Sequence, residues 1–205
     1  EDLVPEKLQG IKDLGFNRLS IGVQSFSDEQ LKRINRTHSA RQAMDGITFA
    51  AGMGFDNISM DLMFGIPSQT VQSLEYSLEE FISLGAEHIS IYSLQLEEGT
   101  PLHRMQNRYE FADDDAVADM YLTINQRMKA AGYIHYEISN FAKPGKMSRH
   151  NLKYWNCEEY LGLGPSAHSY FNGTRFSFIP SINQYLKGIE NMGSETIISD
   201  GSEQI

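Results

Sequence analysis

The sequence predicts an α/β protein, organised as a (β/α) barrel that is incomplete at its N-terminal side and is followed by a loop-rich extension. An amphipathic helix, a glycine and a β-rich strand follow one another four times, which is typical of βα units around a parallel sheet. The intervals between the four glycines are unequal, which excludes a solenoid but is normal for a barrel with insertions. The acidic start at Glu1 passes directly into a helical pattern, which indicates a cut point and no signal peptide.

The predicted barrel part covers residues 1–140. Its helices are expected over residues 6–14, 40–51, 71–84 and 114–131. Each ends at or near a glycine that suits the left-handed position closing a helix: Gly15, Gly54, Gly85 and Gly132. Thr70 and Asp113 are the predicted N-caps of the third and fourth helices. The strands are expected over residues 17–24, 57–65, 88–95 and 133–140.

Each predicted strand alternates an apolar face with a small or polar face. In the second strand the polar face carries Ser59 and Asp61, and in the fourth strand the apolar face carries Ile134, Tyr136 and Ile138. We expect the apolar faces to pack against helices and the polar faces to line a wide, ligand-holding lumen. The alternative is a sheet with one solvated face, which is uncommon for parallel strands.

The extension covers residues 141–205 and is rich in glycine, aromatic residues and histidine. Its pattern predicts irregular loops, a hairpin at FNGTRF with Asn172-Gly173 as the turn, and a helix over residues 182–192. Long ordered loops of this kind are usually functional.

The composition excludes several classes of protein. A net charge of −10 argues against a nucleic-acid binder, which needs a basic surface. No apolar run approaches the length of a transmembrane segment. The single cysteine, Cys157, excludes a disulfide framework and a cysteine-held cluster within these residues, and it fits a reducing, cytoplasmic compartment.

Three polar residues form the first candidate site. Gln24 ends the first predicted strand, Asp61 lies well along the second, and the carboxyl ends of barrel strands build active sites. Arg36 follows a short predicted helix over residues 28–34. An amide, a carboxylate and a guanidinium suit a zwitterionic ligand that carries a ribose. The alternative is a structural Asp–Arg pair, and spacing alone does not decide between the two.

Six segments occur in a characteristic order: LSIGVQSF, NRTHS, DLMFGIPSQT, HYEISNFAKPG, RHNLKYW and YLGLGPSAHSY. From about residue 2 to residue 170 the chain thereby resembles the oxygen-independent coproporphyrinogen III oxidase family of radical S-adenosylmethionine (SAM) proteins. The resemblance implies a barrel of radical SAM type in which Gln24 and Asp61 hold the SAM ribose and Arg36 holds the methionine carboxylate. It also implies that Gly65 borders SAM and that backbone near Gln95 approaches the adenine.

The sequence departs from this family at its metal centre. The CxxxCxxC loop that holds a 4Fe-4S cluster is absent, as is the strand with a SAM-binding glutamate; the resemblance places both before Glu1. We therefore expect that this chain alone neither assembles the cluster nor cleaves SAM. Enzymatic activity stays open; an active protein would be an oxidoreductase of the coproporphyrinogen dehydrogenase type.

HNLKYW at residues 150–155 resembles the HNxxYW signature of the heme-chaperone branch of the family. The resemblance implies that His150 binds heme iron and that Asn151, Tyr154 and Trp155 contact heme or porphyrin. A local basic cluster suits the propionates: Lys143, Lys146, Arg149 and Lys153. The alternative for His150 is a loop histidine that caps a turn, and His168 is a secondary ligand candidate.

Three functions follow as hypotheses. The first is a heme chaperone that passes heme to an acceptor protein while the cluster and SAM modulate the transfer. The second is a coproporphyrinogen III oxidase that decarboxylates propionates through a 5′-deoxyadenosyl radical. The third is a different radical SAM enzyme whose substrate the sequence does not reveal.

Overall fold

The computed structural model describes residues 3–190 and 197–199. The chain divides into two compact units, Glu1–Met147 and Ser148–Ile205. Within the described residues, no helix combines the length and the apolar character that a membrane crossing requires. The predicted assignment of residues 1–140 to a barrel and 141–205 to an extension stays a prediction.

The first unit contains a five-stranded sheet with the order β1-β2-β3-β5-β4. The strands β1 (Leu19–Gln24), β2 (Ile58–Phe64) and β3 (His88–Ser93) are parallel, as the repeated βα pattern predicts. The predicted fourth strand differs, because it divides into β4 (Ile134–Glu137) and β5 (Asn140–Ala142), which pair antiparallel. The side chain of Glu137 favours this reversal, since its carboxylate accepts hydrogen bonds from Ser139 N–H and the Asn140 amide.

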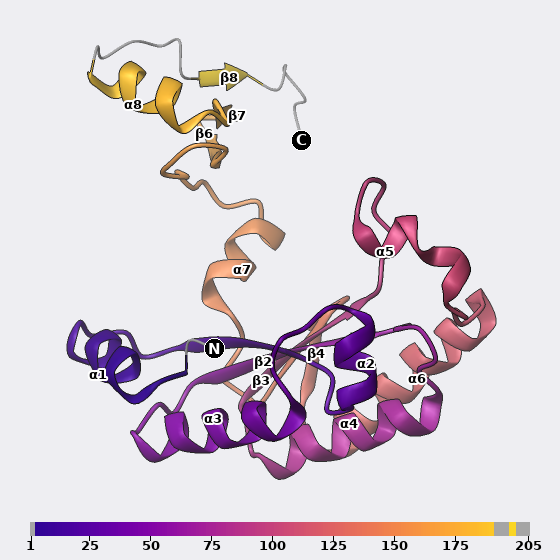
Figure 1. Cartoon of the computed structure of the whole chain (residues 1–205). Helices are drawn as coiled ribbons and strands as arrows, with labels where there is room; N and C mark the ends of the chain where they lie inside the picture. The colour runs from indigo at the N-terminus through magenta and orange to yellow at the C-terminus, as the bar shows by residue number, and fades with distance from the viewer. Residues whose placement is uncertain (1–2, 191–196, 200–205) are drawn as a thin grey trace. The chain divides into compact units, whose positions relative to one another are not determined.

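Four helices of the first unit match the predicted ones to within one or two residues: α1 (Pro5–Asp13), α3 (Ala40–Gly52), α4 (Val71–Ser83) and α6 (Asp114–Ala130). The shorter helices are α2 (Asp28–Arg33), α5 (Pro101–Arg104) and the 3₁₀ turn η1 (Gln106–Arg108). Figure 1 shows α3, α4 and α6 on the same side of the sheet. Thr70 and Asp113 are N-caps as predicted, and the predicted closing glycines all have φ between 74 and 87°.

The hydrophobic core lies between these helices and one face of the parallel strands. The predicted apolar face supplies buried residues from all three strands: Val23, Met60, Leu62, Ile89 and Ile91. The facing helices contribute buried residues that include Leu74, Leu78, Phe81, Ile124 and Met128. The predicted apolar and polar faces are therefore confirmed for β1, β2 and β3.

The faces predicted for the fourth strand are wrong. Ile134 and Ile138 are 41% and 74% exposed, whereas the His135 ring stacks on the core residue Phe141 with ring centroids 4.2 Å apart. The hydroxyl of Tyr136 lies 2.6 Å from a ring nitrogen of His88. The register between β4 and β5 shifts after His135, so strict alternation of faces fails here.

A capping box formed by Ser39 and Gln42 begins α3, and we expect the loss of this capping box to lower the stability of the protein. Ser39 Oγ accepts a hydrogen bond from Gln42 N–H at 3.2 Å, and Gln42 Oε1 accepts one from Ser39 N–H at 2.9 Å. We expect Ser39→Ala to lower the free energy of unfolding by about 1 kcal/mol. Chemical denaturation measures this, with Ser39→Asp as the matched control that keeps a capping acceptor. Equal losses in both variants would contradict a capping role.

The second unit contains α7 (Arg149–Trp155), the strands β6 (His168–Phe171), β7 (Thr174–Phe178) and β8 (Ile197–Ser199), and α8 (Ile182–Glu190). The predicted hairpin is confirmed, with Asn172 and Gly173 at φ 52° and 71° between β6 and β7. The prediction of loops over residues 149–155 is wrong, because α7 forms there with Ser148 as its N-cap. The predicted final helix extends to residue 192, and its last two positions lie outside the described residues.

Candidate functional site

A row of polar side chains crosses the face of the sheet that is opposite the core. Asp61 pairs in register with Gly22 of β1 and with Ser90 of β3. Ser20 Oγ donates a hydrogen bond to Asp61 Oδ1 at 3.3 Å. Burial raises the pKa of the Asp61 carboxyl above its ordinary value, although the hydroxyls of Ser20 and Ser90 and the charge of Arg18 act in the opposite direction. Asp61 is thus a partly desolvated hydrogen-bond acceptor in the middle of the sheet.

Gln24 reaches the same face from an unusual backbone conformation. Its φ is 70°, and Ser25 N–H donates a hydrogen bond to Val23 O at 2.9 Å, which makes Gln24 the centre of a γ-turn. The amide Nε2 of Gln24 lies 3.0 Å from the place that a Cβ would take at Gly22, the register partner of Asp61. The structure therefore brings the Gln24 amide against Gly22, the strand position that pairs with Asp61.

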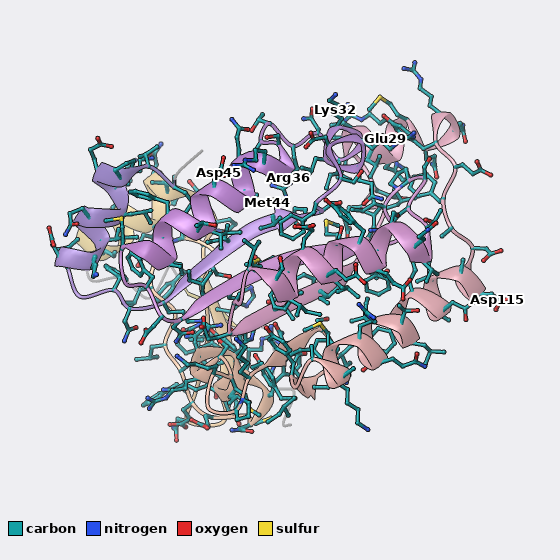
Figure 2. All side chains as sticks on the ribbon, turned by 90° about the horizontal axis from the view of Figure 1, so that it is seen from below. Glu29, Lys32, Arg36, Met44, Asp45 and Asp115 are labelled. Atoms are coloured by element: carbon teal, nitrogen blue, oxygen red, sulfur yellow. The ribbon has the colours of Figure 1, made fainter. Side chains whose placement is uncertain are left out.

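Arg36 is not joined to these two residues. It lies in the connection between α2 and α3 with an exposed side chain (Figure 2). Among residues 3–190, no hydrogen bond or ion pair links its guanidinium to Gln24 or Asp61, so the alternative of a structural Asp–Arg pair does not hold. The cation whose charge acts on Asp61 is Arg18, which also donates to Asn57 Oδ1 at 2.6 Å. A contact of Arg36 with SAM stays a prediction.

Gly65 lies where the carboxyl ends of β2 and β3 meet. It is buried at φ 74°, and a Cβ there would lie 3.8 Å from Val117 Cγ2 and 4.0 Å from Leu94 N. Leu94 N–H donates a hydrogen bond to Phe64 O at 2.8 Å, and the exposed Gln95 follows directly. The structure therefore places the predicted Gly65 and Gln95 at one edge of the sheet; their contact with SAM stays a prediction.

A buried hydrogen-bond chain through His88 lies on the polar face and was not predicted from the sequence. His88 Nδ1 lies 2.7 Å from Ser59 Oγ, and its Nε2 lies 2.6 Å from the Tyr136 hydroxyl. Burial, together with the charge of Arg18, lowers the pKa of His88 to about 4, so the imidazole is neutral at physiological pH. The available signal was the period-two spacing of His88 and Ser90 on one strand face.

The predicted heme residues share one side of α7. His150, Asn151, Tyr154 and Trp155 occupy helix positions i, i+1, i+4 and i+5. The Tyr154 hydroxyl lies 3.0 Å from His150 Nε2, and the two rings meet edge to face with centroids 5.1 Å apart. Trp155 is 60% exposed. Since Ser148 caps this helix, the alternative of His150 as a turn-capping residue is wrong.

Two residues of the predicted basic cluster bind backbone carbonyls of the first unit. Lys143 Nζ donates to Gly85 O at 2.9 Å and Lys146 Nζ donates to Asp56 O at 2.7 Å. Both carbonyls closely follow helices of the first unit, where cations are favoured. Arg149 and Lys153 are the two members on α7.

The donors of this chain do not fit an iron–sulfur cluster. The sequence contains one cysteine, Cys157, which is exposed. In the part of the chain that the structure describes, no group of three or more His, Cys, Asp or Glu residues could hold a metal ion. A cluster of the radical SAM type needs three thiolates, so its ligands are not residues of this chain.

Comparison with known proteins shows which sequences this chain is similar to. Residues 1–81 match the Radical SAM superfamily. The chain is 43% identical over 195 residues to the heme chaperone HemW of Bacillus subtilis (strain 168). The matched region covers 94% of this chain and 52% of that protein. It is 41% identical over 154 residues to the heme chaperone HemW of Escherichia coli (strain K12), and this match covers 75% of this chain and 40% of that protein.

Solved structures show the same fold. Coproporphyrinogen III oxidase (HemN) from Escherichia coli, a radical SAM enzyme, matches with a TM-score of 0.75 at 21% identity, over 93% of this chain and 46% of that chain. The archaeal Elp3 of Methanocaldococcus infernus matches with a TM-score of 0.54 at 22% identity, over 59% of this chain and 29% of that chain.

These matches show that the chain carries radical SAM domain sequence within an α/β fold of the HemN type. Over most of its length the chain is similar to the HemW heme chaperones, so the resemblance found in the motifs is confirmed. The chain spans about half the length of the curated relatives it matches.

Proposed function

We propose that this chain is part of a heme chaperone of radical SAM type, which binds heme and transfers it to an acceptor protein. The observation that carries the proposal is the exposed surface of α7, where His150, Tyr154 and Trp155 lie on one side of the helix. The similarity to HemW proteins over most of the chain supports it. The single cysteine fits a cytoplasmic location.

The chemistry of this surface suits a heme. A neutral imidazole binds iron through an unprotonated ring nitrogen, and the Tyr154 hydroxyl lies 3.0 Å from Nε2, within hydrogen-bond reach of that nitrogen. The rings of Tyr154 and Trp155 offer apolar area to a macrocycle. Asn151 adds an amide on the same side of α7, and the cations of Arg149 and Lys153 suit propionates.

The first unit is proposed to hold SAM. Gln24 and Asp61 would bind the ribose, Arg36 the methionine carboxylate, and the backbone at Gly65 and Gln95 would border the ligand. The approach of the Gln24 amide to Gly22, the register partner of Asp61, supports the first two assignments. A 4Fe-4S cluster, held by residues outside this chain, would supply the electron that SAM cleavage needs.

A heme titration of the full-length protein tests the proposed function. We expect a saturable shift of the Soret band near one equivalent of heme, and loss of that band when apomyoglobin is added as a model acceptor. A protein that shows no Soret shift, yet converts coproporphyrinogen III in the presence of SAM after cluster reconstitution, would contradict the chaperone and favour the oxidase.

In the His150 tautomer that binds iron through Nε2, the Tyr154 hydroxyl at 3.0 Å donates to that nitrogen and would compete with iron, which gives a further prediction. We expect Tyr154→Phe to bind heme about 3- to 10-fold more tightly, because one hydrogen bond of about 1 kcal/mol no longer has to be broken. The phenylalanine keeps the ring. The matched control is Tyr160→Phe, whose ring packs edge to face on Tyr154 with centroids 4.5 Å apart. Weaker binding by Tyr154→Phe alone would show that the hydroxyl contacts the ligand instead.

A further inference from the structure

We infer that Gln30 and Gln69 are a pair of positioning residues, which hold Gln24 in its γ-turn and thereby set the affinity for SAM. This inference rests on the proposed function, which assigns Gln24 to SAM. Neither residue belongs to the candidate site, and both side chains lie beneath the loops that carry it, with 4% and 5% exposure.

The γ-turn at Gln24 needs support from its surroundings. A φ of 70° is uncommon for a residue with a side chain, and such conformations persist where neighbouring contacts over-determine them. The turn also coincides with the register shift between β1 and β2. A relaxed backbone at this point would carry the Gln24 amide away from Gly22 and from the neighbouring Asp61.

Gln30 fixes the residue that follows the turn. Ser25 Oγ donates a hydrogen bond to Gln30 Oε1 at 2.7 Å and accepts one from Ser27 N–H at 3.0 Å. Gln30 Nε2 in turn donates to Ser73 Oγ at 3.0 Å, in the first turn of α4. The loop after β1 is therefore attached to α2 and, through one side chain, to α4.

Gln69 connects these hydrogen bonds to the loop that follows β2. Its Nε2 donates to Gln30 Oε1 at 3.3 Å and to Met63 O at 3.3 Å. Its Oε1 accepts a hydrogen bond from Ile66 N–H at 3.3 Å, directly after Gly65. One buried network thus joins the loops that end β1 and β2.

The use of two buried glutamines, where apolar side chains would also fit, indicates that the network positions the loops around it. A leucine at either position would fill similar volume without requiring partners, and buried amides are costly unless each is satisfied. Both amides here have partners on oxygen and nitrogen, and a fully satisfied network specifies one arrangement of its loops. The backbone fixed by the network belongs to the loops of Gln24 and Gly65, two of the positions proposed to contact SAM.

A double-mutant cycle tests the inference. In the full-length protein with its cluster reconstituted, we expect Gln30→Leu to weaken SAM binding about 5- to 10-fold in calorimetry, the loss of roughly one well-placed hydrogen bond. Gln24→Ala weakens binding by itself. When Gln30→Leu is added to Gln24→Ala, no further loss is expected, because no amide is left to position. Equal losses in both backgrounds would show a purely structural role and overturn the inference.

Three further variants make the result decisive. Gln69→Leu repeats the test from the other half of the pair, and Gln72→Leu, exposed in the first turn of α4, is the control that should leave affinity unchanged. Gln30→Glu keeps both acceptor contacts of Oε1 but loses the Nε2 hydrogen bond to Ser73 and buries a charge, so only part of the affinity is expected to return. Unchanged affinity in Gln30→Leu, with Gln24→Ala weakened, overturns this inference alone. Unchanged affinity in Gln24→Ala removes Gln24 from the SAM site and overturns both.

Discussion

Replacing His150 with alanine in the full-length protein is expected to lower heme affinity by at least about 100-fold, because the variant loses the proposed iron ligand. The Soret shift of the titrated protein measures this loss. Alanine is a strong helix former and Ser148 supplies the N-cap, so α7 should persist in the variant. Far-ultraviolet circular dichroism checks that the fold is kept.

His168→Ala is the matched control for this substitution. His168 begins β6 in the same unit and is also exposed, and it was the secondary ligand candidate. Its loss should leave the Soret shift in place. A Soret band that is the same in wild type and in His150→Ala would remove His150 as a ligand, and a band lost only in His168→Ala would move the ligand to β6.

The sequence predicted those parts of the fold that depend on local pattern. Period-two alternation placed Met60 in the core and Asp61 on the opposite face, and one residue of slip would have exchanged them. Glycines after apolar helical runs marked the helix ends correctly, since a left-handed φ is inexpensive only for glycine. Thr70 could be identified as a cap because its oxygen acts within three residues, on Ser73 N–H.

The features that the sequence missed depend on contacts between distant segments. The reversal after Glu137 produces an antiparallel pair in which Ser90 faces Asn140, and no local period reports that pairing. The turn at Gln24 is supported by Gln69, which lies 39 positions beyond its partner Gln30 in the chain. Each residue in this network looks like an ordinary surface glutamine or serine until the loops are folded together.

Asp61 shows how a site residue can oppose stability. Burial raises the pKa of its carboxyl, and the hydrogen bonds from Ser20 and Ser90 offset this only in part. A raised pKa means that ionisation is less favourable in the folded state than in the unfolded state. The free energy of unfolding therefore falls as the pH rises from the ordinary value of 3.8 through the raised folded value, and the loss persists above it.

We expect Asp61→Asn to weaken SAM binding by about 10- to 100-fold, because hydrogen bonds from ribose hydroxyls to a charged acceptor are worth about 1.5–3 kcal/mol. The same variant should unfold at a higher temperature than wild type at neutral pH in the absence of SAM, since no desolvated charge remains. Calorimetric titration and thermal melts between about pH 4 and 7 measure the two effects.

Asp45→Asn is the matched control for Asp61→Asn. Asp45 lies on α3 (Figure 2) in an exposed i,i+4 ion pair with Arg41 at 3.0 Å, so its loss should change stability by less than about 0.5 kcal/mol and leave SAM affinity unchanged. Opposite signs of the two effects in Asp61→Asn, with neither effect in Asp45→Asn, would mark Asp61 as a residue whose position serves a ligand. Unchanged SAM affinity would remove Asp61 from the ribose. A lower melting temperature would show that the carboxylate is needed to hold Ser20 and Ser90 in place.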